Sequence, residues 1–184
     1  MTTRERILRA ATAEFAEHGL AGARVARIAS AATANKERIY HYFGPKEQLF
    51  EAVLEHAMEE IRAAEPFRAE DLGAYVDTML AFHRERPELV RLLLAEGEVR
   101  RPEERRAHYA SRVAAVRRAQ QAGAVRADVD PRFVVFIVLA TVVAAEAMPG
   151  LSALILDGSD PGEGIHALLA GPAPPDRSLI DTRR

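Results

Sequence analysis

Residues 35–43 carry a dense set of side chains that can contact a nucleic acid. If the segment is helical, Ile39 and Phe43 share one face and serve the core, which leaves the other positions for contacts. Arg38 can bond guanine O6 and N7 together, and Glu37 can accept a hydrogen bond from a cytosine amino group. The pattern therefore indicates a surface that reads base edges. Its remaining polar members are Lys36, Tyr40, His41 and Tyr42.

Lys36 and Lys46 are the only lysines in a chain with 23 arginines. Each is expected within the first turn of a helix. Free backbone N–H groups and the positive end of the helix dipole attract phosphate there. Both positions are therefore predicted to lie near the phosphate backbone.

Four helices are expected to position these side chains. Apolar residues recur at helical spacing over residues 4–18, where His18-Gly19 supplies a stop, and then over 24–31, 35–42 and 46–64. Asn35 can cap the third helix, and Gly44-Pro45 separates it from the fourth. A tight turn between the second and third helices gives the outline of a helix-turn-helix, in which the later helix enters the major groove.

Four stretches extend this outline over roughly residues 4–53: RILRAA (6–11), FAEHGLAG (15–22), VARIA (25–29) and KERIYHYFGPKEQL (36–49). In their order and spacing they closely resemble the DNA-binding segment of the tetracycline-repressor (TetR) family of bacterial transcription regulators. The resemblance implies double-stranded operator DNA as a partner. It also implies an all-helical second domain that dimerises through its last helices and encloses a ligand pocket.

The resemblance also implies roles for individual residues. Tyr40, Tyr42 and Lys46 become contacts to the phosphate backbone. Bases or nearby phosphates are then met by Lys36, Glu37, Arg38 and His41. Arg24 and Arg27, near the start of the second helix, are expected either to touch the backbone or to be solvated.

The turn departs from the family pattern. Thr33-Ala34 stands where the family usually has Gly followed by Val, and Glu37 stands where a small residue is common. Threonine is expected to occupy such a turn only with strain or altered geometry. Operator choice and docking detail depend on these positions.

Beyond residue 64 the pattern stays helical, with boundaries at proline and glycine. Helices are expected at 71–86, 88–97, 103–122 and 131–148, with weaker ones at 151–156 and 162–170. The fold class is all-α, with a three-helix helix-turn-helix domain over residues 1–45. A helical ligand-binding and dimerisation domain follows over residues 46–171. The tail, residues 172–184, is rich in proline and polar groups and is predicted to be disordered.

Large apolar and polarisable side chains in the second domain, interleaved with a few polar ones, suit a cavity for a small apolar or amphipathic effector. The same residues would also make a sound core. His83 and Tyr109 are the most plausible polar members. The predicted pocket residues are Tyr75, Met79, Phe82, His83, Tyr109, Val113 and Phe136.

His56 with Glu59 or Glu60 has a spacing that can offer two metal ligands, but such residues are far more often a surface pair. No metal and no cofactor are therefore predicted.

The segment from residue 133 to residue 148 is apolar nearly all round, and a partner subunit would bury it best. The sequence and the resemblance together predict a two-fold homodimer built on this helix and on the one expected at 162–170. Its recognition helices would address half-sites about 34–36 Å apart on a palindromic operator. The expected interface residues are Phe133, Ile137, Thr141, Ala144, Ala145 and Met148.

Composition narrows the function further. With no cysteine, disulfides and thiolate catalysis are excluded. No nucleophile triad, phosphate-cradling glycine loop or paired Glu-x-x-His motif supports an enzyme. The rival that stays open is a helical ligand-sensing module without specific DNA binding, which Thr33-Ala34 would permit.

The apolar run at 133–145 is shorter than the roughly 20 residues that span a bilayer, and the N-terminus lacks a signal-peptide core. We therefore expect a cytoplasmic, nucleoid-associated protein with no membrane partner. The net charge of −2 averages two unlike parts. Residues 1–50 hold eight basic and five acidic side chains, whereas the rest hold 17 and 22. A basic DNA-binding part is thus expected beside an acidic body.

Overall fold

The computed structural model describes residues 1–64, 67–97 and 102–171. Within these ranges the chain is helical, and its only strand-like feature is an isolated bridge between Val125 and Ala170. The predicted disordered tail lies outside the described residues. The helices are α1 (Thr3–Gly22), α2 (Val25–Ala31), α3 (Lys36–Phe43), α4 (Lys46–Ala64), α5 (Leu72–Glu85), α6 (Pro87–Ala95), α7 (Pro102–Gln121), α8 (Pro131–Ala147), α9 (Pro149–Leu156) and α10 (Pro161–Leu169).

The first three helices and the start of α4 share one apolar core. The rings of Phe15 and Phe50 meet edge to face, with 4.9 Å between their centroids. A capping box between Thr2 and Glu5 begins α1. Gly19 takes a left-handed conformation (φ 63°), so regular helix is interrupted where it was predicted to stop, and one further turn follows to Gly22.

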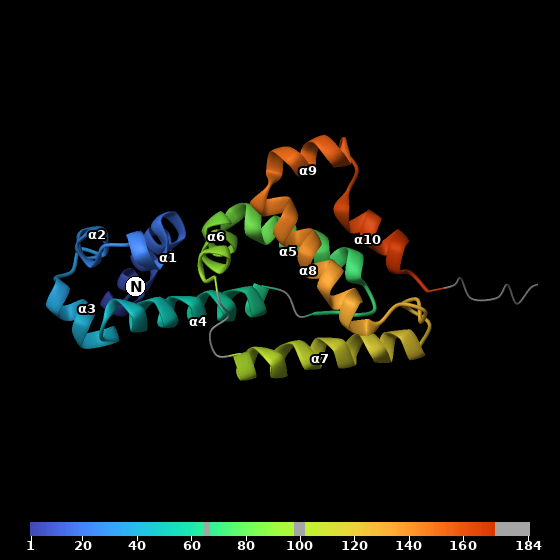
Figure 1. Cartoon of the computed structure of the whole chain (residues 1–184), viewed down its shortest axis with the longest axis horizontal. Helices are drawn as coiled ribbons and strands as arrows, with labels where there is room; N and C mark the ends of the chain where they lie inside the picture. The colour runs from blue at the N-terminus through green and yellow to red at the C-terminus, as the bar shows by residue number, and fades with distance from the viewer. Residues whose placement is uncertain (65–66, 98–101, 172–184) are drawn as a thin grey trace, which may run out of the picture.

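Helix α4 extends from this core toward the rest of the molecule, and α7 runs below α4 in this view (Figure 1). The second domain is built from α5 packed on α8 and α10, with α7 on α8, while α6 packs against α1. Asp130 caps α8 by accepting from the Arg132 backbone N–H at 2.8 Å, and Pro131 occupies the first turn, where its missing N–H costs nothing. The all-helical fold is confirmed.

Helix α8 buries one face and exposes the other. Val134, Val135, Val138 and Val142 face the core. A bend of 112° then leads into α9, none of whose residues is buried. No single helix in the described ranges has the length and apolarity to cross a membrane, whereas α8 and α9 together reach them only across this bend.

Candidate nucleic-acid interface and regulatory core

The turn between α2 and α3 is closed by backbone and cap hydrogen bonds. The backbone N–H of Ala34 donates to the Ala29 carbonyl at 2.9 Å. Thr33 between them adopts φ 49°, the left-handed conformation in which a Cβ atom is unfavourable. The expectation of strain at this residue is therefore correct. The Asn35 side chain then accepts from the Arg38 backbone N–H at 2.9 Å and starts α3.

Helix α3 lies at one end of the molecule, remote from α9 and α10 (Figure 1). Ile39 and Phe43 are buried, as predicted, and hold the helix on the core. Tyr40 is half exposed, at 50 %. The six predicted contact residues of the helix all face solvent: Lys36, Glu37, Arg38, Tyr40, His41 and Tyr42.

Lys46 lies at the start of α4 but reaches back to the loop between α1 and α2. Its Nζ atom donates to the Ala23 carbonyl at 3.3 Å and approaches the Ala21 carbonyl at 3.5 Å. This ammonium therefore adds positive charge close to the N-terminus of α2. Two helix N-termini and one cation are thus brought near the same place.

Arg24 and Arg27 differ in their surroundings. The Arg27 guanidinium forms an ion pair with Glu14 and donates to the Gly22 carbonyl at 3.0 Å. The hydrogen bond to Glu14 raises the pKa of Arg27. Burial works against ionisation of Glu14, but the bonds from Arg27 and from the Arg24 backbone N–H nevertheless lower the pKa of that carboxyl. Arg24 keeps an exposed side chain.

Sequence reasoning missed Glu14. It lies on α1, ten residues before Arg24 and thirteen before Arg27, and only the packing of α1 on α2 brings it to them. No spacing rule within one helix would have indicated the contact.

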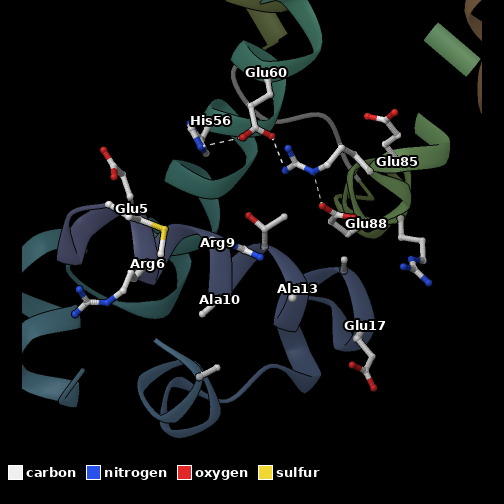
Figure 2. A pocket seen from close by; sticks show the side chains of 16 residues that line it. Glu5, Arg6, Arg9, Ala10, Ala13, Glu17, His56, Glu60, Glu85 and Glu88 are labelled. Atoms are coloured by element: carbon white, nitrogen blue, oxygen red, sulfur yellow. Dashed lines mark hydrogen bonds and ion pairs between the residues drawn. The ribbon is translucent and has the colours of Figure 1, made fainter. Parts of the chain in front are cut away.

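A half-open groove of about 1210 Å³ lies where α1 meets α4 and α6. Figure 2 shows Glu60 on its wall between His56 and an arginine that also reaches Glu88. Glu60 lies 3.3 Å from His56 Nε2 and 2.8 Å from Arg86 Nη2, and Arg86 Nε donates to Glu88 at 2.7 Å. The bond to Glu88 is the main cause of the raised pKa of Arg86, with Glu60 adding to it.

Glu60, Arg86 and Glu88 therefore form an ion-pair chain, and His56 lies beside Glu60. In the described ranges no group of three or more side chains is arranged to hold a metal ion. The chain joins α4 to the start of α6, the helix that packs on α1.

The predicted pocket residues divide into three groups. Tyr75, Met79 and His83 follow one another at four-residue intervals on α5 and are all buried. Phe82, Tyr109 and Val113 are partly buried against the core. Phe136 is different.

Phe136 is 64 % exposed and stacks on Phe133 across 6.2 Å on the outer face of α8. The i, i+3 spacing of these two residues places them away from the valine face of the helix. The structure thus separates Phe136 from the other predicted pocket residues and brings it to a predicted interface residue.

The predicted interface residues lie along the outer and lateral sides of α8. Phe133 and Met148 are about half exposed. Ile137, Thr141, Ala144 and Ala145 have intermediate exposure. Exposed apolar side chains extend this surface onto α9 and α10: Leu151, Leu154, Ile155 and Leu168.

Arg112 on α7 was also missed by sequence reasoning, although it is only 7 % exposed. Its guanidinium carbon lies 5.1 Å from the Phe67 ring centroid, 5.7 Å from Tyr75 and 6.0 Å from Tyr109. A signal was present, because Arg112 stands four residues before the buried Val116 and so shares the inner stripe of α7.

Together these features define a helix-turn-helix DNA-binding protein with a helical regulatory domain. Residues 7–53 match the family model described as "Bacterial regulatory proteins, tetR family", and residues 71–164 match "Tetracyclin repressor-like, C-terminal domain". The chain belongs to the TetR family of transcriptional regulators.

Similar proteins support this family assignment. The HTH-type transcriptional repressor SCO4008 of Streptomyces coelicolor is 40 % identical over 166 residues, covering 87 % of this chain and 86 % of the relative. The crystal structure of the putative transcriptional regulator SCO4942 from the same species matches with a TM-score of 0.81 at 30 % identity, over 93 % and 100 % of the two chains. Bacillus subtilis FadR in complex with stearoyl-CoA shares the fold, with a TM-score of 0.64 at 17 % identity over 90 % and 96 %.

Proposed function

We propose that this regulator is a ligand-responsive repressor that binds a palindromic operator as a homodimer and is released by a small apolar or amphipathic molecule. The observation that carries the DNA-binding part is the division of α3. Two buried anchors, Ile39 and Phe43, hold a helix whose other face presents six polar or aromatic side chains to solvent. Such a face suits the major groove.

Within this account, contacts divide by chemistry. Arg38 and Glu37 read base edges, whereas Lys36, Tyr40, His41 and Tyr42 meet bases or phosphates close to them. Lys46 and Arg24 contact the phosphate backbone of the DNA beside the start of α2. Arg27 acts through Glu14, which makes it a residue that positions α2 rather than a direct contact.

The proposed domains are residues 1–45 for DNA binding and 46–171 for ligand binding and dimerisation. A second copy that covered Phe133 and Met148 would remove exposed aromatic and apolar surface from water. Two copies would place two basic modules beneath one acidic body, which favours docking by the recognition helices alone. The operator target makes the protein cytoplasmic and nucleoid-associated.

Effector release requires a ligand that binds the DNA-incompetent arrangement more tightly. The aromatic and buried polar groups of α5 and α7 are the proposed pocket, and FadR with stearoyl-CoA supports it by showing that this fold can hold a small molecule. A shift of α4 would move Lys46, which is its first residue, and would reach α1 through the direct packing of the two helices. The α4–α6 ion pair is the proposed route by which the same shift reaches α6.

Selection of binding sites from a pool of random duplexes, followed by sequencing, tests the proposal. We expect enrichment of one inverted repeat with half-sites about one helical turn apart. A matched selection with Arg38→Ala should enrich a repeat with weaker preference at one base pair of each half. No enrichment would favour the alternative, a helical ligand-sensing module without specific DNA binding.

A further inference from the structure

Arg112 is a buried cation without a carboxylate partner in the described part of the chain. Its guanidinium is surrounded by the rings of Phe67, Tyr75 and Tyr109. Ring faces attract a cation, but they leave its N–H groups without an oxygen to bond. The Nε atom of Arg112 is buried and has no hydrogen-bond partner. A buried guanidinium in this condition is costly to the folded protein.

Two histidine nitrogens of the same domain share this lack of a hydrogen-bond partner. His83 Nδ1 on α5 and His108 Nε2 on α7 are also buried without partners. Burial lowers the pKa of His83, and it lowers the pKa of His108 together with the positive charges of Arg112 and Arg62. Both imidazoles therefore stay neutral near pH 7. A neutral imidazole can donate one hydrogen bond without demanding a second charge.

The charged groups that act on the residue one helical turn before Arg112 are positive. His108 stands one helical turn before it, and the charged groups that act on His108 are two arginines, Arg112 and Arg62. The site is thus formed by an unpaired cation, a second arginine from α4, neutral imidazole and aromatic surface. Among the residues that the structure describes, no carboxylate is paired with Arg112 in this site.

We propose that Arg112 anchors the anionic head group, a carboxylate or a group of like chemistry, of an effector whose remaining body is apolar. The inference rests on the proposed ligand-responsive function and specifies the chemistry of the ligand. The head group accepts from the guanidinium in a charge-assisted hydrogen bond, and the apolar body lies against the rings and Met79. An anion at this position meets α5 and α7 at once, because Tyr75 and Tyr109 share the cage.

Three probes that share a ten-carbon chain test the chemistry: decanoate, decanol and decyltrimethylammonium, each titrated by calorimetry against the full chain without DNA. We expect decanoate to bind at least about tenfold more tightly than either of the other two probes. A tenfold difference in affinity corresponds to the contribution of about one charge-assisted hydrogen bond. Equal affinities, tighter binding of the cation, or no binding of any probe would overturn the proposal. Tighter binding of the cation would mean that a ligand replaces Arg112 in the cage.

Arg112→Met keeps the length and removes the charge. It should weaken decanoate binding about tenfold or more, leave decanol binding within about threefold, and unfold no earlier than the wild type, since an unpaired buried charge is removed. Arg112→Gln is the second variant if the first does not fold. Arg118→Gln, on the exposed side of the same helix, is the matched control and should bind decanoate as the wild type does. Decanoate affinity that is unchanged in the Arg112 variant would contradict the assignment.

The two proposals fail separately. If decanoate binds through Arg112 but no operator is found, the anion site stands and the operator proposal fails. If an operator is bound and decanoate shows no preference or no dependence on Arg112, the anion site fails and the repressor proposal stands.

Discussion

Arg86 Nη2 on the N-terminal cap of α6 lies 2.8 Å from Glu60 Oε2 on α4. Helix α4 begins in the DNA-binding part, and α6 packs against α1, so this pair closes a triangle of three helices around the groove in Figure 2. The pair thus supplements the direct packing of α1 on α4 and α6.

A double-mutant cycle with Glu60→Gln and Arg86→Gln measures this link. Both side chains are partly exposed, so we expect a coupling energy of about 0.5–1 kcal/mol in urea unfolding, decreasing at high salt. The single change His56→Gln should lower the free energy of unfolding by less than Glu60→Gln does. A coupling near zero at low salt would remove the pair from the proposed route.

Thr33→Gly should stabilise the helix-turn-helix. Glycine accepts φ 49° without the Cβ penalty, and the exposed threonine side chain packs little, so we expect a gain of about 0.5–1 kcal/mol in the free energy of unfolding. Thr33→Ala keeps the Cβ and should change stability much less. Thermal unfolding of the wild type and the two variants tests this expectation. A loss of stability in Thr33→Gly would show that Thr33 makes contacts that outweigh its backbone strain.

Asp77 on α5 and Asp160 at the start of α10 form a pair of acids. Burial raises the pKa of Asp77, and the charge and hydrogen bonding of Asp160 add to this, with Glu163 and Asp71 contributing. The pKa of Asp160 is lowered instead, first by the backbone N–H of Glu163 and also by Asp77 and Arg84. A raised carboxyl pKa means that its stabilising contribution is complete below the ordinary value and is lost as pH rises through the raised value.

Asp77→Asn should therefore raise Tm at pH 7 by about 1–3 °C, with the advantage disappearing as the solution is acidified. The amide keeps a donor for Asp160 without the repulsion. Differential scanning calorimetry between pH 4 and pH 8 checks the sign. An advantage that grows toward acid would contradict the assignment. Asp128 is the control, because the pKa of its carboxyl is lowered, so Asp128→Asn should lose stability at pH 7 instead.

Arg38→Ala and Lys46→Ala separate base reading from phosphate contact. The first should cost about 1–3 kcal/mol on the preferred sequence and relax its preference at one position. The second should weaken all duplexes alike and reduce the slope of log affinity against log salt by about one. Fluorescence anisotropy over a salt series gives both quantities. Equal effects of the two variants on preference would show that the roles are wrongly assigned.

Local chemistry explains what could be predicted. Asn35 and Asp130 mark helix starts because their side chains accept from the first turn. The Asn35 cap forms as predicted, and Asp130 caps α8 by the same chemistry. The burial of Ile39 and Phe43 follows from their spacing alone. These are interactions within a few residues, which a sequence displays directly.

Features missed by sequence reasoning depend on packing between helices. Glu14 meets Arg27 only through the crossing of α1 and α2, and Arg86 meets Glu60 across 26 residues. Phe136 was placed with the pocket because α8 is apolar on every side, so its composition does not distinguish inner from outer faces. By residue type, Arg112 does not differ from its many solvated arginine neighbours. Only its position four residues before the buried Val116 distinguishes it.

The central claim is that this chain selects one DNA sequence through α3. Its most direct test is a titration of the selected inverted repeat and a scrambled duplex of equal length near physiological salt. We expect binding at nanomolar to micromolar concentrations, with about 10³-fold or greater preference for the repeat, two chains per duplex, and an affinity that falls with salt. Equal affinity for the two duplexes would contradict it.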